Sequence, residues 1–160
     1  MMSLAFDVIR SLAGKTLATA ESCTGGGIGA ALTAVPGSSA VYKGGIISYT
    51  NEVKENLLGV SSEVLHLKGA VSPEVAELMA VGARKALNAD IAVSVTGLAG
   101  PGGDNYGNPV GTVYIGYADA NQRLSNACFF SGDRDAIRAQ AVECALALIL
   151  NYGGNQDSGC

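Results

Sequence analysis

The chain has 160 residues, enough for one domain with a substantial core and too few for a second domain of ordinary size. Ten lysines and arginines stand against fourteen aspartates and glutamates, and a net charge of −4 without a basic run argues against a nucleic-acid partner. Apolar residues make up 48% of the chain, yet the longest apolar run, ALALILNY, is too short to span a bilayer and no signal peptide opens the sequence, so we expect a cytoplasmic protein that binds small molecules and no membrane.

The cysteines and the single histidine do not form a metal-binding pattern. No C-x-x-C spacing occurs among Cys23, Cys128, Cys144 and Cys160, and His66 is the one histidine. Soft-ligand metal sites need several such side chains at short spacing. We therefore expect reduced thiols and no metal.

The predicted elements alternate between helix and strand along most of the chain. Helices are predicted over residues 3–13, 26–35, 51–58, 73–87 and 133–151. Strands are predicted over residues 16–20, 44–50, 89–96, 110–118 and 123–131. This alternation is typical of the α/β class. We expect a single-domain three-layer α/β/α sandwich with a mixed, mostly parallel five-stranded sheet.

Several segments refine this architecture. The strand over 89–96 is apolar on both faces, which predicts a central strand covered by helices on both sides. The strands over 110–118 and 123–131 are joined by a polar turn and should form an antiparallel hairpin. The last helix is apolar nearly all round, which indicates burial on two sides or a homo-oligomer. The domain should span residues 1–152, and the polar tail over 153–160 is predicted to be disordered.

The most informative segment is ATAESCTGGG, in which a strand runs into three glycines and a helix-compatible stretch. Such a turn gathers side chains and main-chain N–H groups at one point, which suits an anion or a developing oxyanion. The glycine spacing fits neither of the common nucleotide-binding glycine motifs. The candidate residues are Ser22, Thr24, Gly25 and Gly26. Alternatively, Thr24 is simply the N-cap of the following helix.

A lysine near the start of a predicted helix breaks a local rule. If Asn51 is the N-cap, Lys54 occupies the third helical position, where the helix dipole disfavours a cation. Together with partial burial, this would lower the pKa of the amine until it could take a proton from a hydroxyl group. Tyr49, at the end of the preceding strand, could relay that proton. The alternative is a solvated lysine beside a tyrosine whose hydroxyl lies in water.

Two further segments contain candidate binding residues. The central strand ends at Thr96 and Gly97 and runs into a loop rich in glycine and proline, where a ligand could approach the main chain closely. A flexible surface loop is the alternative. In the last helix, Arg134 and Arg138 lie one turn apart and could clamp a phosphate, unless they pair with acids on the surface.

Six motifs occur in the chain in this order: AESCTGG, the GSS turn, SYTNEVK, GAVSPEV, SVTGLAGPGG and FSGDRDAIRAQA. Together they resemble the CinA carboxy-terminal domain family, and the resemblance extends from about Arg10 to Tyr152. The chain looks like the stand-alone form of that domain, without the amino-terminal domain of longer CinA proteins. The resemblance implies nicotinamide mononucleotide amidohydrolase activity, which forms nicotinate mononucleotide and ammonia in pyridine nucleotide salvage, without a metal or organic cofactor.

The resemblance also implies which positions carry function. The matching residues are Ser22, Ser39, Tyr49, Lys54, Thr96 and Arg138. We hypothesise that Ser39 attacks the carboxamide carbon while Lys54, with Tyr49 beside it, accepts the hydroxyl proton and later delivers it to ammonia. The rival nucleophile is Ser22.

The remaining parts of this mechanism concern binding. Main-chain N–H groups at Gly25 and Gly26, or at Gly97, would stabilise the oxyanion. The 5′-phosphate would be held by Arg134 or Arg138.

Two other classes of function remain open. A nucleotide-binding module without turnover would bind the substrate and release no ammonia. A protein-interaction domain in DNA uptake or repair is suggested by the competence-associated name of the family, and a free apolar face on the last helix would favour it.

Overall fold

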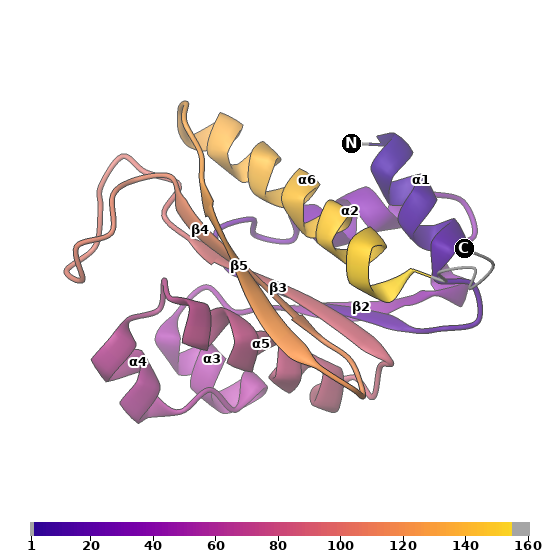
Figure 1. Ribbon diagram of the computed structural model, residues 1–160, viewed down its shortest axis with the longest axis horizontal. Helices are drawn as coiled ribbons and strands as arrows, with labels where there is room; N and C mark the ends of the chain where they lie inside the picture. The colour runs from indigo at the N-terminus through magenta and orange to yellow at the C-terminus, as the bar shows by residue number, and fades with distance from the viewer. Residues whose placement is uncertain (1, 155–160) are drawn as a thin grey trace.

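Residues 2–154 are described by the computed structural model, in which helices cover both faces of one mixed sheet (Figure 1). The strands are β1 (Leu17–Glu21), β2 (Tyr42–Ile47), β3 (Ile91–Gly97), β4 (Thr112–Ala118) and β5 (Arg123–Phe129). Their order is β2-β1-β3-β4-β5. Three strands, β2, β1 and β3, run parallel, and β4 and β5 add an antiparallel hairpin. The predicted α/β class, mixed five-stranded sheet and hairpin are therefore confirmed.

The helices form the two outer layers. They are α1 (Met2–Ser11), α2 (Gly27–Thr33), α3 (Asn51–Leu58), α4 (Ser62–Lys68), α5 (Pro73–Ala86) and α6 (Arg134–Gly153), with a short 3-10 turn η1 (Ser38–Ala40). Figure 1 shows α1, α2 and α6 on one face and α3, α4 and α5 on the other, which confirms the predicted three layers. The sequence pattern predicts neither α4 nor η1, because seven and three residues are too few to display a helical period.

The two faces of the sheet differ in side-chain size. The face toward α6 carries large apolar side chains, such as Leu17, Val93 and Ile115. The face toward α5 carries alanines from β1 and β3, together with Gly116 of β4. A Cβ at Gly116 would clash with the carbonyl of Ala76 in α5, so the small residues allow this helix to pack closely on the sheet.

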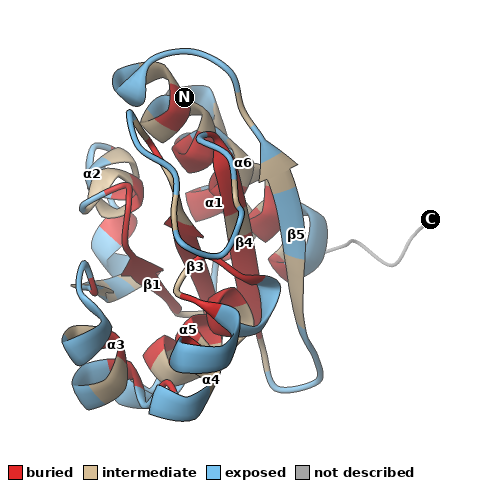
Figure 2. Ribbon diagram, turned by 90° about the vertical axis from the view of Figure 1, so that its left-hand side faces the viewer, coloured by how far each residue is buried: buried red, intermediate tan, exposed pale blue. Residues whose placement is uncertain are grey.

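The central strand and the edge strand differ in burial, as Figure 2 shows. Residues 91–96 of β3 are all buried, which confirms the prediction of a central strand covered on both faces. Most of β5, at the edge of the sheet, is exposed or half-buried. Among the described residues, no helix is long and apolar enough to cross a membrane.

The apolar surface of α6 is covered largely within this chain. The helix packs against α1 and α2 and against β3 and β4, which accounts for its burial on two sides. The predicted homo-oligomer stays a prediction. The helix α6 continues to the buried Gly153. The predicted boundary between domain and tail after residue 152 stays a prediction. Residues 155–160 of the predicted disordered tail lie outside the described residues.

Candidate active site

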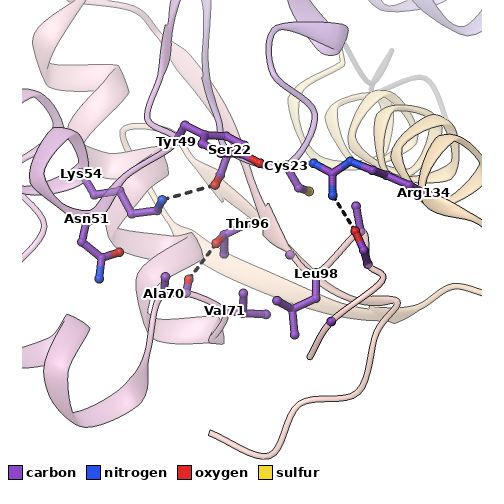
Figure 3. A pocket seen from close by; sticks show the side chains of 14 residues that line it. Ser22, Cys23, Tyr49, Asn51, Lys54, Ala70, Val71, Thr96, Leu98 and Arg134 are labelled. Atoms are coloured by element: carbon purple, nitrogen blue, oxygen red, sulfur yellow. Dashed lines mark hydrogen bonds between the residues drawn. The ribbon is translucent and has the colours of Figure 1, made fainter. Parts of the chain in front are cut away.

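A cavity at the carboxyl end of β1 contains six of the eleven predicted site residues. The chain leaves β1 through α2 on one face and returns to β3 from α5 on the other, so β1 ends at a topological switch point, where open α/β sheets bind ligands. The cavity volume is about 280 Å³, just below the usual range for small-molecule sites. The lining residues, shown in Figure 3, are Ser22, Cys23, Tyr49, Asn51, Lys54, Ala70, Val71, Thr96, Gly97, Leu98, Ala99, Gly100, Gly102 and Arg134.

Lys54 lies buried in this cavity and points toward Ser22 (Figure 3). It comes from the first half of α3, and its side chain is packed so closely that the residue is only 1% exposed. Its Nζ donates a hydrogen bond of 2.6 Å to the carbonyl of Ser48 and one of 3.3 Å to Oγ of Ser22. The alternative of a solvated lysine is therefore wrong. An amine in hydrogen-bond contact with a hydroxyl is the arrangement of a base and its nucleophile.

Burial lowers the pKa of Lys54 from its ordinary 10.5 to about 8. Roughly a tenth of the amine is then neutral at about pH 7 and can accept a proton. The predicted position in the helix was wrong by one residue, because the N-cap is Thr50, whose side chain accepts the N–H of Val53. Desolvation, and not a place in the third helical position, is thus the main cause of the lowered pKa.

Ser22 and Cys23 follow β1 directly and both line the cavity. The N–H of Ser22 donates to the carbonyl of Val95 at 3.0 Å, which continues the pairing of β1 with β3 and fixes the serine at the strand end. Burial raises the pKa of the Cys23 thiol to about 11, so the thiol stays protonated at neutral pH and is a poor nucleophile. Because Nζ of Lys54 contacts Oγ of Ser22, the serine is the better candidate for attack.

Tyr49 and Arg134 are both exposed residues of the cavity wall, and Arg134 lies across the cavity from Lys54 (Figure 3). The guanidinium of Arg134 donates to the Tyr49 hydroxyl at 3.2 Å and to the carbonyl of Gly100 at 2.7 Å. The predicted pairing of Tyr49 with Lys54 is therefore not found, because the phenol pairs with the arginine. The two side chains place a positive charge at the rim of the cavity.

Thr96 and Gly97 form the end of β3 and line the cavity, as predicted. The hydroxyl of Thr96 donates to the carbonyl of Ala70 at 2.7 Å and so holds the chain before α5 against the strand. A Cβ at Gly97 would clash with Val113 of β4. The need for glycine here comes from packing within the sheet, and not only from the approach of a ligand.

The amino-terminal end of α2, where we predicted an anion site, is occupied by the buried carboxylate of Glu21. This side chain, 2% exposed, accepts the main-chain N–H groups of Ile28 at 2.9 Å and Gly29 at 3.0 Å. It also accepts the hydroxyl of Thr24 at 2.7 Å. Sequence reasoning missed Glu21, although an acid placed before a glycine turn that starts a helix is a signal for this role.

The three predicted residues of the glycine turn do not line the cavity. The N-cap of α2 is Gly26 and not Thr24, whose hydroxyl is bound to Glu21. The N–H of Gly25 donates to the carbonyl of Ser22 within the turn. The geometry therefore does not support an oxyanion role for Gly25 or a substrate contact for Thr24.

Arg138 stabilises the same turn from α6. Its Nε donates to the carbonyl of Cys23 at 2.9 Å and its Nη2 to the carbonyl of Thr24 at 3.2 Å. It does not line the cavity, whereas Arg134 does. The predicted clamp of two arginines is thus not present, because the two guanidinium groups bind different parts of the chain.

Ser39 lies apart from these residues. It is an exposed residue of η1, which precedes β2, whereas the cavity lies beyond the other end of that strand. A strand of six residues spans roughly 17 Å. The predicted partnership of Ser39 with Lys54 is therefore not formed within this chain, and Lys54 contacts Ser22 in its place.

Within residues 2–154, no group of three or more His, Cys, Asp and Glu side chains is arranged to hold a metal ion. The cysteines of this part, Cys23, Cys128 and Cys144, are free thiols.

Comparisons with known proteins agree on one family. Residues 3–152 match the CinA C-terminal domain. A CinA-like protein of Thermosynechococcus vestitus is 51% identical over 138 residues, which cover 84% of this chain and 33% of that relative. A CinA-like protein of Synechocystis is 50% identical over 121 residues, 76% of this chain and 29% of that relative. The chain thus spans about a third of the length of the curated relatives it matches.

The fold is also similar to that of solved structures. The crystal structure of the competence damage-inducible protein A from Klebsiella pneumoniae has a TM-score of 0.92 and 38% identity, covering 94% of this chain and 95% of that one. The competence/damage inducible protein from Agrobacterium tumefaciens has a TM-score of 0.91 and 40% identity, with 95% and 94% covered. Sequence match and fold together show that this chain belongs to the CinA C-terminal domain family.

Proposed function

We propose that the protein hydrolyses the carboxamide of nicotinamide mononucleotide to nicotinate mononucleotide and ammonia, with Ser22 as nucleophile and Lys54 as its base. The observation that carries this proposal is the buried amine of Lys54 in hydrogen-bond contact with Ser22 Oγ. Membership of the CinA C-terminal domain family supports the choice of substrate through the resemblance described above.

The chemistry begins with the neutral fraction of Lys54. The amine takes the Ser22 hydroxyl proton as Oγ attacks the carboxamide carbon. The resulting ammonium gives this proton to the amide nitrogen, which leaves as ammonia when the C–N bond breaks. Water then hydrolyses the acyl-serine ester by the same base. The side-chain amide of Asn51, which also lines the cavity, supplies an N–H group for the oxyanion.

The two ends of the cavity suit the two ends of this substrate. Val71 and Leu98 give apolar surface for the pyridine ring, and Arg134 offers a guanidinium for the phosphate at the rim. Because Glu21 occupies the end of α2, an anionic group on the ligand would be repelled there and attracted to Arg134.

The test is release of ammonia from nicotinamide mononucleotide by the purified protein, in the presence of a chelator. Turnover is expected in the wild type and a loss of at least about 10³-fold in Ser22→Ala and in Lys54→Met. Lys43→Met, which changes an exposed lysine of β2, is the matched control and should keep full activity.

Two outcomes would contradict the proposal. Binding without ammonia release would identify a nucleotide-binding module in place of an enzyme. Loss of activity in Ser39→Ala, with activity kept in Ser22→Ala, would return the nucleophile to Ser39.

A further inference from the structure

We propose that Glu21 is the positioning residue of the Ser22–Lys54 pair. This inference rests on the proposed function and adds to it a residue that does not line the cavity. Its basis is that Glu21 connects three separate pieces of the chain: the amino-terminal end of α2, the turn that carries Ser22, and the residue that holds Lys54.

The first connection is made by the carboxylate. Both oxygens accept main-chain N–H groups of α2, from Ile28 and Gly29, and Oε1 also accepts the hydroxyl of Thr24. Ser22 lies between Glu21 and Thr24 in the sequence. Because the side chains of these two residues are hydrogen-bonded to each other, the segment that contains Ser22 is fixed at both ends. Charge-assisted hydrogen bonds of this kind are stronger than neutral ones and fix geometry accordingly.

The second connection is made by the main-chain carbonyl of Glu21. It accepts the N–H of Ser48 at 2.7 Å and the hydroxyl of Ser48 at 3.3 Å. The carbonyl of Ser48 in turn accepts Nζ of Lys54 at 2.6 Å. A single residue therefore links the base to the peptide that precedes the nucleophile.

A third group of contacts to the carboxylate comes from side chains of β1 and β2. The hydroxyl of Thr19 donates to Glu21 Oε2 at 3.4 Å and lies 2.6 Å from the hydroxyl of Tyr42. The single hydrogen of the Thr19 hydroxyl goes to Glu21, so the Tyr42 hydroxyl donates to Thr19. Burial raises the pKa of the Tyr42 phenol. A Cβ at Gly29 would approach the Tyr42 hydroxyl to 2.8 Å, which is closer than real contacts allow. The site is thus built to present donors to a carboxylate.

Glutamine is a sharp replacement because it keeps the size of the side chain. The amide oxygen of glutamine can still accept one of the two N–H groups of α2. Its NH₂ group would then lie against the second N–H group, and two donors cannot form a hydrogen bond. In Glu21→Gln the turn should therefore shift while the fold persists. A misplacement of about 1 Å in reacting groups can cost about 10²-fold in rate.

The experiment measures kcat and KM for ammonia release by Glu21→Gln, together with the titration of Lys54 followed by NMR of its side-chain carbon in labelled protein. We expect kcat to fall about 10²-fold per folded molecule, KM to stay within about twofold, and the pKa of Lys54 to rise as water reaches the amine. Glu63→Gln, an exposed acid in the first turn of α4, is the matched control and should change none of these.

The outcomes separate this proposal from a role in stability alone. If kcat and the Lys54 titration match the wild type, Glu21 only stabilises the fold and the proposal is overturned. If the wild type itself releases no ammonia, the proposed function fails, and the Lys54 titration alone decides whether Glu21 positions the pair.

A second variant covers the case in which Glu21→Gln does not fold. Thr24→Val removes one donor to the carboxylate and leaves the α2 contacts in place. It should lower kcat severalfold with KM unchanged, and an unaltered kcat would overturn the proposal.

Discussion

Burial of Lys54 should make the stability of this protein depend on pH in a way that one substitution removes. The pKa of Lys54 is about 8 in the folded protein and 10.5 at its ordinary value, which applies to the unfolded chain. Between these values the unfolded chain binds more protons than the folded protein, so the free energy of unfolding rises with pH. Burial of the charged amine lowers the free energy of unfolding. This penalty is fully present below the pKa of Lys54 in the folded protein and is relieved as the pH approaches its pKa in the unfolded chain.

The size of this effect follows from the two pKa values. Each tenfold change in proton affinity is worth about 1.36 kcal/mol, so the full penalty is about 3 kcal/mol. From about pH 7 to about pH 9.5, about 2 kcal/mol of it should be relieved. In a domain of this size that corresponds to a rise in Tm of about 4–8 °C.

The assay is thermal unfolding of the wild type and Lys54→Met across this pH range. The hydrogen bonds that the variant loses displace its Tm by an amount that changes little with pH, and the other titrating groups are common to both proteins. The difference in Tm, wild type minus variant, should therefore increase by about 4–8 °C from about pH 7 to about pH 9.5. Lys43→Met, at an exposed site, should show no such trend. A difference that stays constant within about 1 °C would refute burial as the cause of the lowered pKa.

The same geometry predicts three further results. The kcat/KM for ammonia release should rise about tenfold per pH unit below about pH 8 and then level off, because Lys54 must be neutral to accept a proton. Arg134→Gln should raise KM for nicotinamide mononucleotide about tenfold or more and leave turnover of nicotinamide riboside, which lacks the phosphate, unchanged in the same assay. Gly116→Ala should lower Tm by several degrees in thermal unfolding, because its Cβ would clash with the carbonyl of Ala76.

The parts of the fold that could be predicted from the sequence are elements with a clear hydrophobic pattern, enough residues to display it, and clear boundaries. The strand β3 has apolar residues on both of its faces, so its central place in the sheet could be inferred. The short α4 could not, since it has seven residues and a single buried leucine. The start of α2 was placed too early because Gly26, with a φ of 103°, belongs to the left-handed turn and not to the helix.

The candidate site, like the fold, could be predicted from the sequence only in part. Ser22 and Thr96 follow or end parallel strands, so strand pairing alone brings them to one edge of the sheet. Side-chain direction is different, because it depends on neighbours distant in sequence. Arg134 and Arg138 share a helix face in the sequence pattern, yet one binds the loop carbonyl of Gly100 and the other binds the turn after β1. No local signal distinguishes them.

The most consequential error of the sequence prediction concerns the glycine turn, and the arrangement found there bears on the proposed role of Lys54 as a base. The sequence suggests that this turn receives an anion from outside, but the anion is the side chain of Glu21, directed into α2. None of the residues that line the cavity is acidic. A carboxylate beside Lys54 would raise its pKa and keep it protonated, which would end its use as a base. The carboxylate of Glu21 is bound by N–H groups of α2 and no acid lines the cavity, so burial lowers the pKa of Lys54 without an opposing carboxylate there.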